Sequence, residues 1–460
     1  MNEQKIFLKL STEKAQDDVH RLKILKAVTT YDTQVSQMKS SQFSDWSEAR
    51  QRASEIKEEV LENWPDLLEE FETKITQRGA KVWWASNKTE ALDYFSKIVD
   101  KHQANKIVKS NSMTTEEIEF NEYCHGQGLE VLESDLGELI VQLAGEKPYH
   151  IVTPAMHKTR SEIGRLFQEK LNAPLTEDPE QLTMVARQHL RRGYITSDIG
   201  VTGANFIIAD EGAVVMTENE GNGRLTMSCP PVHVVIVGIE KIIPRLTDLS
   251  LFLPLLATSG TGQQITGYNS VIRGPRRPNE NDGPQEMHVI LLDNGRSQMY
   301  ANKTYRAALK CIRCGACLNV CPVYRSIGGH SYHTTYQGPI GSVITPQLAD
   351  LHQWGHLTYA SSLCAACTSV CPVQIDIHHL LLESRWEMSR KILDGHFWKY
   401  ALQTWAWIMS SRTRLSFTMK FIRPFYRIFL PLLPAGKRKR IPAIPKRPFK
   451  QIWKEYEQSR

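Results

Sequence analysis

Seven of the nine cysteines in this 460-residue chain fall within 61 residues, and they constrain its fold more than any other feature. They form two sets, Cys311, Cys314, Cys317 and Cys321, followed by Cys364, Cys367 and Cys371. A secreted disulfide scaffold usually distributes an even number of cysteines along a short chain. The clustered, odd-numbered arrangement instead predicts one local cofactor site in a reducing compartment.

The spacing of the two sets indicates which cofactor to expect. The first set reads Cys-x2-Cys-x2-Cys-x3-Cys-Pro, which is typical of bacterial ferredoxins that carry two iron–sulfur clusters. The second set repeats this motif 50 residues later, with Ser361 in place of its first cysteine. Zinc sites use paired Cys-x2-Cys hooks with four ligands in all. The repeated spacing therefore favours [4Fe–4S] clusters over zinc and over plain buried thiols.

The ferredoxin rule also predicts ligand sets, because the fourth cysteine of each motif reaches the other cluster. Cluster one should be held by Cys311, Cys314, Cys317 and Cys371, and cluster two by Cys321, Cys364 and Cys367. Cluster two is one thiolate short. Three explanations stay open: a ligand such as Ser361 or water, a [3Fe–4S] cluster, or a ligand from Cys124, Cys229 or a partner. Two such clusters would form a one-electron relay.

The two remaining cysteines and the four histidines between the cysteine sets are interpreted as packing residues. Cys124 falls in a predicted helix and Cys229 in a Ser-Cys-Pro turn, and free cysteines are among the most often buried residues. The stretch between the two cysteine sets contains four histidines: His330, His333, His352 and His356. Donation to a cluster sulfur and iron ligation are alternatives for these, but packing of a connecting loop is favoured.

The chain before the cysteines reads as an α/β protein. Residues 1–75 are predicted helical, with an apolar stripe on 48–64 and 66–76. Strands at 81–85, 106–109, 129–132 and 149–153 are each followed by a helix, which predicts a mainly parallel sheet covered on both faces. The helix at 114–125 is expected to begin with a Thr114, Glu117 capping box.

From residue 195 the predicted strands come closer together. Residues 205–209 and 213–217 read as a hairpin, and the apolar runs 233–238 and 288–293 as buried central strands. The Gly- and Pro-rich stretch 258–284 is expected to be a long loop. A domain boundary is placed near Gly295, before a helix at 297–310.

A ligand pocket is a candidate interpretation of the small and acidic residues that follow strands. The stretches concerned are Thr202-Gly-Ala-Asn205, Asp210-Glu-Gly212 and Glu218-Asn-Glu-Gly-Asn222. Asp210, Glu218 and Glu220 are candidate acid–base groups, and Lys109 or Arg224 candidate carboxylate clamps. Ordinary turn residues are the favoured interpretation of these stretches. The glycines at 260–267 do not form a dinucleotide-binding fingerprint.

Charge separates the C-terminal third from the rest. Residues 301–460 have a formal net charge of +16, whereas residues 1–300 have a formal net charge of −10. From about 385 the chain combines aromatic and basic residues, among them Trp405, Trp407 and Phe421, and it continues with Lys437-Arg-Lys-Arg440 and the Pro-rich stretch 441–448. Docking of a partner is ranked first, a membrane surface second and nucleic acid, which is not expected, third. An aromatic core helix followed by a solvated basic end is the alternative.

Neither a secretory signal nor a membrane span is evident. The N-terminus has no apolar run, and the longest apolar stretches fall far short of the roughly 20 residues that a bilayer crossing requires. We therefore expect a cytoplasmic protein, with peripheral contact at the inner face of the membrane as a further expectation for the basic tail.

Taken together, these motifs resemble the lactate-utilization protein B family of iron–sulfur proteins, across essentially the whole chain. The resemblance rests on the cysteine tandem without its eighth ligand and on further motifs: Gly328-Gly-His330, Gly338-Pro-Ile-Gly341, Thr345-Pro346, Lys109-Ser-Asn-Ser112, Ile199-Gly-Val-Thr-Gly-Ala-Asn205, Ala209-Asp-Glu-Gly212, Thr217-Glu-Asn-Glu-Gly-Asn222, Gly274-Pro-Arg-Arg277 and Leu292-Asp-Asn-Gly-Arg296. The family's ligand pattern falls on all seven clustered cysteines and shares the absence of a cysteine at the Ser361 position.

The resemblance implies a division of the chain and a function. The expected parts are a helical segment (1–75), a lactate-utilization α/β domain similar to sugar-phosphate isomerase and CoA-transferase folds (76–296), an α-helical ferredoxin-like two-cluster domain (297–385) and a basic, aromatic tail (386–460). The implied role is an electron-transfer subunit, working with two companion proteins and an electron acceptor to oxidise L-lactate to pyruvate and enable growth on lactate. A stand-alone oxidoreductase that binds a small hydroxy acid or carboxylate, and a redox-sensing module, are the alternatives. The family provides no agreed catalytic residue.

Overall fold

The computed structural model describes residues 2–393, 396–429, 447 and 449–459. The chain forms two compact units, Met1–Met388 and Ser389–Arg460. The first unit contains both sheets and all nine cysteines. The finer division of the chain into four parts stays a prediction.

Helices form the beginning of the chain, as predicted. They are α1 (Glu3–Gln16), α2 (Asp18–Gln42), α3 (Trp46–Glu62) and α4 (Trp64–Gln77). Asp45 caps α3 by accepting the backbone N–H groups of Ser47 and Glu48. The apolar faces of α3 and α4, which include Val60 and Phe71, are buried in the main core.

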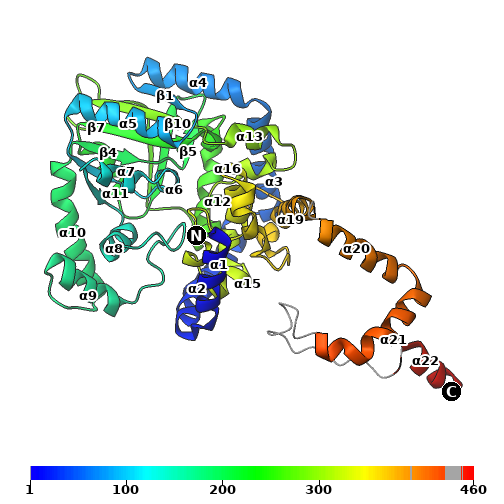
Figure 1. The fold of residues 1–460 in the computed structure, drawn as a ribbon. Helices are drawn as coiled ribbons and strands as arrows, with labels where there is room; N and C mark the ends of the chain where they lie inside the picture. The colour runs from blue at the N-terminus through cyan, green and yellow to red at the C-terminus, as the bar shows by residue number, and fades with distance from the viewer. Residues whose placement is uncertain (1, 394–395, 430–446, 448, 460) are drawn as a thin grey trace. The chain divides into compact units, whose positions relative to one another are not determined.

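A six-stranded parallel sheet is the frame of the first unit (Figure 1). Its order is β1 (Lys81–Ala85), β10 (Glu286–Leu292), β7 (Val232–Gly238), β4 (Ile199–Thr202), β2 (Lys106–Lys109) and β3 (Glu130–Glu133). Every neighbouring pair is parallel. The two apolar runs therefore lie at the centre, as predicted, because a parallel sheet buries its central strands on both faces.

Alternate residues of β7 show that both faces of this sheet are covered. Val234 and Ile236 belong to a core cluster with residues of α5 (Lys88–His102) and α7 (Phe120–Gly126). Val235 and Val237 point to the opposite face, into the cluster that contains residues of α3 and α4. The predicted α/β layering is confirmed.

Two local predictions in this region are wrong. Residues 149–152 form bends and residue 153 is irregular, and the next strand after β3 is β4, which follows α8 (Leu136–Ala144), α9 (Arg160–Leu171) and α10 (Pro179–Thr196). Tyr149 is buried by tertiary contacts instead of strand pairing, because its carbonyl accepts the Tyr324 hydroxyl at 2.9 Å.

The predicted helix at 114–125 is two helices, α6 (Met113–Glu117) and α7. Glu119, at a left-handed φ of 55°, separates them. The cap is Ser112 and not Thr114, since the Ser112 hydroxyl accepts the backbone N–H of Thr115.

A second sheet contains β8 (Ile242–Ile243), β5 (Phe206–Ile208), β6 (Ala213–Glu218) and β9 (Tyr268–Ile272), in that order. The antiparallel β5–β6 pair confirms the predicted hairpin. The predicted loop at 258–284 is wrong in part, because α12 (Leu249–Thr261) runs into it and β9 lies within it. Strand β9 is a mostly exposed edge strand, so its sequence lacks the apolar pattern of a central one.

Short helices surround the cysteines. They are α13 (Arg296–Ala301), η3 (Arg306–Lys310), α14 (Ala316–Asn319), α15 (Pro322–Ile327), η4 (His330–Tyr332), α16 (Gly338–Leu348), α17 (Leu351–Trp354), η5 (Gly355–Tyr359), α18 (Ala366–Val370) and α19 (Ile377–Leu393). The predicted helix at 297–310 is divided between α13 and the 3₁₀ helix η3. The region is helical, as expected; its ferredoxin-like character stays a proposal.

The second unit consists of α20 (His396–Met409), α21 (Arg412–Phe429) and α22 (Phe449–Gln458) in the part of the chain described. Three of its large side chains that the structure describes are exposed: Trp405 by 59%, Trp407 by 61% and Phe421 by 62%. The alternative of an aromatic core helix stays a prediction. Lys437-Arg-Lys-Arg440 and nearly all of 441–448 lie outside the described residues. Among the helices that are described, none has the length and apolar character to cross a membrane.

A buried ion network joins the sheet to the cysteine segment. The Glu240 carboxylate, after β7, pairs with Arg296 of α13 and with Arg313 of the first cysteine loop, and each side chain is at most 8% exposed. Arg296 also pairs with Glu117 of α6 at 2.8 Å. Burial alone would raise the pKa of Glu240, but Arg296 and Arg313 lower it to about 2. The Glu240 carboxylate is therefore charged, and the positive charges of Arg296 and Arg313 offset its negative charge.

Replacing Arg296 with Met should destabilise the first unit strongly, because Glu117 and Glu240 would lose their main buried counter-charge. We expect a loss of about 3–5 kcal/mol in the free energy of unfolding, measured by anaerobic urea unfolding of the full chain. The control is Lys88→Ala, which breaks an exposed pair with Glu119 and should cost less than about 1 kcal/mol. Equal losses in the two variants would contradict this account.

Candidate metal centre and the cavity beside it

The two cysteine loops share a backbone conformation, so the sequence repeat has a structural counterpart. Arg313 and Leu363, 50 residues apart, have φ angles of 60° and 54°, and Gly315 and Ala365 have 80° and 62°. Helices α14 and α18 then begin at Ala316 and Ala366. Three of these four left-handed residues are not glycine, which is uncommon and indicates a constrained loop.

Four thiols form the first group. Cys311, Cys314, Cys317 and Cys371 line one small, largely apolar cavity. Burial raises the pKa of Cys314, and the neighbouring Cys371 and Cys311 thiolates raise it further. Burial and then Cys311 raise the pKa of Cys371 to about 11.

Three thiols form the second group. Burial, with the charges of Cys321 and Cys364 nearby, raises the pKa of Cys367 to about 11. Cys364 is exposed, and its pKa is lowered because the Ala366 N–H and the Ser362 hydroxyl donate to its sulfur. The assignment of these seven thiols to two clusters is the prediction made from their spacing. That these thiols ligate iron stays a prediction.

The surroundings suit an inorganic cluster with net negative charge. Three backbone N–H groups donate hydrogen bonds to cysteine sulfurs. The Arg313 N–H donates to Cys311 at 3.4 Å, the Tyr324 N–H to Cys321 at 3.5 Å and the Ile375 N–H to Cys371 at 3.3 Å. Cationic side chains also lie in electrostatic range of these thiols. Cys311 has Arg313, Lys57 and Lys241 in range, Cys314 has Lys39, and Cys371 has Arg50. Thiolate donors, N–H groups aimed at sulfur and an apolar lining are the environment that tunes iron–sulfur clusters.

The two lone cysteines lie apart from these groups. Cys124, on α7, is buried in the core cluster that contains Phe95 and Phe120, and burial raises its pKa to about 12. Cys229 is exposed and ends α11 (Asn222–Ser228) before β7 begins, so it lies at the amino-terminal edge of the sheet. Core packing therefore accounts for Cys124.

Three of the four histidines between the cysteine sets have polar contacts of their own. His330 Nε2 donates to the Lys147 carbonyl at 2.7 Å, and His333 pairs with Glu3 at 3.0 Å. His356 Nδ1 donates to the Gln353 carbonyl at 3.1 Å, and its ring packs against Phe7. The side chain of His352 is exposed. These contacts agree with a packed connecting loop.

A cavity of about 690 Å³ adjoins the first thiol group. Its lining follows the carboxyl ends of four parallel strands: residues 110–114 after β2, Asp135 after β3, residues 203–205 after β4, and Lys241 after β7. Residues 216–220 and 222–223 line it as well, and so does Cys314. Ligands of open α/β sheets bind at this edge, and the volume suits a small molecule.

The predicted pocket residues are only partly brought together. Residues 203–205, Glu218 and Glu220 line the cavity, whereas Asp210, Glu211 and Gly212 form a turn against α4, where Lys74 donates to the Asp210 carbonyl. Burial and the nearby Asp135 charge raise the pKa of Glu220 to about 7.

Neither predicted carboxylate clamp faces this cavity. Lys109 is fully buried and pairs with Glu133 at 2.9 Å and with Glu116 at 3.3 Å. The Arg224 guanidinium lies over the Tyr268 ring at 5.4 Å. Both cations are therefore engaged elsewhere.

Lys241 is the cavity cation that sequence reasoning missed. It is 9% exposed, and no described residue accepts a hydrogen bond from its Nζ. Burial and then Arg313 lower its pKa to about 8. Arg313 lines the same cavity, and its Nη1 also lacks a partner among the described residues. The available signal was the charged pair Glu240-Lys241, which begins two residues after the end of the apolar strand β7.

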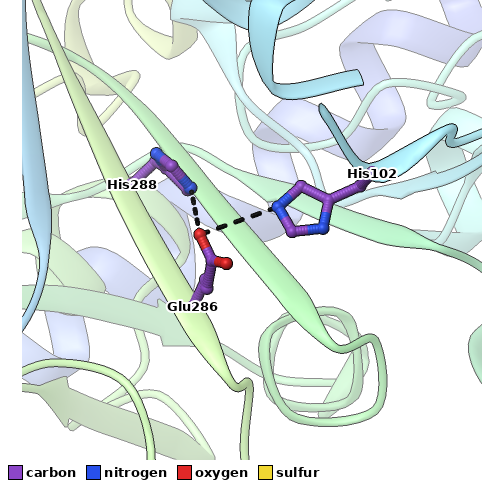
Figure 2. A group of neighbouring side chains, drawn as sticks. All are labelled: His102, Glu286 and His288. Carbon is purple, nitrogen blue, oxygen red and sulfur yellow. Dashed lines mark ion pairs between the residues drawn. The ribbon is translucent and has the colours of Figure 1, made fainter. Parts of the chain in front are cut away.

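A separate His–Glu–His group does not form a metal site (Figure 2). Glu286 Oε2 lies 3.3 Å from His288 Nε2 and 3.6 Å from His102 Nε2. Trp83 Nε1 donates to His288 Nδ1 at 3.1 Å, so the proton of the neutral ring is on Nε2, the nitrogen that a metal would need. Lys81 and Lys101 also pair with Glu286 and would repel a cation.

Comparisons with known proteins place two families on the chain. A LUD domain model matches residues 68–292, and a 4Fe-4S dicluster domain model matches residues 307–375. The first match contains the strands of both sheets, and the second contains all seven clustered cysteines.

Several curated proteins are similar over most of their length. Lactate utilization protein B of Bacillus velezensis and of Bacillus licheniformis are each 44% identical over 353 residues, which is 76% of this chain and 74% of the relative. The Bacillus subtilis protein of the same name is 43% identical with the same coverage. A crystal structure of a DUF162 family protein from Deinococcus radiodurans matches 50% of this chain and 97% of its own, at 14% identity and a TM-score of 0.28, which is too low to support a structural argument.

Proposed function

Because this chain belongs to the lactate utilization protein B family, we propose that it is the iron–sulfur electron-transfer subunit of a complex that oxidises L-lactate to pyruvate and enables growth on lactate. One observation carries the proposal: Cys314 of the first thiol group lines the cavity, whereas Cys364 of the second group is exposed. The two groups thus lead from a ligand-sized cavity to the protein surface.

The proposed ligand sets are those of the ferredoxin rule. Cys311, Cys314, Cys317 and Cys371 would hold one [4Fe–4S] cluster, and Cys321, Cys364 and Cys367 a second one that lacks a fourth thiolate. When bound, such clusters supply one-electron redox chemistry. The chain's own part would be to bury three of the four thiols of the first site, to donate N–H groups to its sulfurs, and to offset its negative charge with Arg313, Lys57 and Arg50.

Two companion lactate-utilization proteins and an electron acceptor complete this proposal. The rim of the second thiol group offers them an exposed surface, since Cys364 and Ser362 are exposed and Tyr359 is 52% exposed. The exposed aromatic side chains of α20 and α21, next to Arg412 and Arg414, favour docking of an acidic partner first and contact with an anionic membrane surface second.

The isolated chain, reconstituted anaerobically, should show cluster absorbance and accept electrons from a low-potential reductant. It should show little or no lactate oxidation. An electron carrier without its companion proteins lacks the site that removes two electrons from lactate. Absorbance spectroscopy together with a lactate-dependent dye-reduction assay tests this expectation. Robust turnover by the chain alone would contradict the role of pure carrier.

A second function is favoured by the unpartnered ammonium of Lys241. The cavity that it lines is of ligand size, and a desolvated ammonium with free donors is suited to a carboxylate. The alternative is therefore a stand-alone oxidoreductase that binds a small hydroxy acid or carboxylate in the α/β domain. Glu220, with its pKa near 7, is available there as a proton acceptor.

Calorimetry with lactate and pyruvate tests this second function. With its pKa near 8, Lys241 is mostly charged at pH 7 and mostly neutral at pH 9, so binding should weaken as the pH rises. Lys241→Met should cost about 1.5–3 kcal/mol, roughly 10- to 150-fold in Kd, and should remove the pH dependence near pH 8 while leaving the one that Glu220 contributes near pH 7. Lys88→Met, which changes an exposed lysine, is the control. Absence of any heat with either acid would count decisively against the alternative.

A further inference from the structure

We propose that the hydroxyl oxygen of Ser361 is the eighth cluster ligand, completing the site of Cys321, Cys364 and Cys367. This inference rests on the proposed two-cluster function and deepens it. The sequence leaves three explanations open for the missing ligand of cluster two, and we assign this ligand to the hydroxyl oxygen of Ser361.

The first support is an equivalent hydrogen bond in the two repeats. The Arg313 N–H donates to Cys311 Sγ at 3.4 Å, and 50 residues later the Leu363 N–H donates to Ser361 Oγ at 3.1 Å. Cys311 and Ser361 are both half-buried. Ser361 Oγ therefore takes the place in the second loop that a ligand sulfur has in the first.

A serine at the start of an ordinary turn forms the same type of bond, so the backbone around it matters. Leu363 is held at a left-handed φ of 54° and Ala365 at 62°, conformations that cost energy for residues other than glycine. These are the angles of the complete cysteine loop. The second loop thus keeps the shape of a four-ligand site although its first ligand is not a cysteine.

Arg385 holds the segment before Ser361 in position. Its Nη2 donates to the Ser361 carbonyl at 2.6 Å, and its Nε donates to the Thr358 carbonyl at 2.9 Å. The serine backbone is thereby fixed from outside the loop, while the hydroxyl stays on the side of the Leu363 N–H. A preorganised oxygen loses little conformational entropy when it binds iron.

The competing side chains are placed less well. Cys124 is enclosed in the core cluster of α5 and α7, and Cys229 lies at the amino-terminal edge of the sheet. His356 is the strongest rival, because its Nδ1 carries the proton and its buried Nε2 lacks a partner among the described residues. Its ring, however, packs against Phe7 and Trp354 on the side of α1 and α17.

Binding of the Ser361 oxygen to iron requires no oxidant, because only a proton is lost. One Fe–O bond forms, and the hydroxyl proton leaves to solvent at the exposed rim beside Ser362 and Cys364. The Leu363 N–H continues to donate to the resulting alkoxide. Oxygen is a harder ligand than thiolate, so the iron at this corner should differ spectroscopically from the other three and be the first one lost.

The test uses the full chain, reconstituted anaerobically, with iron analysis, Mössbauer spectroscopy, and EPR after mild oxidation. Wild type should contain about eight irons, with one iron distinct from the rest. Ser361→Ala should lose that distinct iron and give the EPR signal of a three-iron cluster. Ser361→Cys should convert the distinct iron to a thiolate-ligated one and resist oxidation. The matched control is Ser369→Ala, an exposed serine whose hydroxyl donates to the Ala365 carbonyl; its spectra should equal those of wild type.

Two results would overturn the assignment. One is a distinct iron that persists unchanged in both Ser361→Ala and Ser361→Cys. The other is its loss in His356→Gln while Ser361→Ala keeps it. A failure of the two-cluster proposal is distinguishable from both, because wild type itself would then contain about four irons or fewer.

Discussion

The buried carboxylate of Glu240 is the interaction on which the arrangement of this protein depends. It follows the central strand β7 and pairs with Arg296, which starts α13, and with Arg313, which lies between the first two cysteines. Three buried charges in contact tolerate little displacement, since each would otherwise be left unpaired in a low-dielectric interior. The first cysteine loop is therefore held at the carboxyl edge of the sheet, and Cys314 reaches the cavity there.

This placement gives the two thiol groups different environments. The first is buried among apolar side chains and cations, next to the cavity and to Lys241. The second has Cys364 at the surface and the cation Arg325 in electrostatic range of Cys321. Helices α14 and α18 pack against each other, and Cys317 lies in electrostatic range of Cys367, so the groups are close neighbours. Proximity and asymmetry together suit a directional relay.

The sequence predicted those features that depend on local pattern. The cysteine repeat has a counterpart in two loops of like backbone conformation, and the apolar runs predicted β7 and β10, because a parallel sheet buries both faces. Features that depend on distant contacts were missed. Tyr149 has the sequence surroundings of a strand residue but is buried by Tyr324, and Lys109 is neutralised by Glu133. Lys241 faces the cavity only because four strand ends converge there.

The central claim is that two iron–sulfur clusters lie near each other in one chain and connect the cavity with the surface. EPR of the fully reduced, reconstituted protein during a potentiometric titration tests it most directly. The account predicts two reducible centres whose signals are broadened and split by magnetic coupling, as expected for neighbouring clusters. A single uncoupled signal at full reduction, with one reduction step, would contradict it.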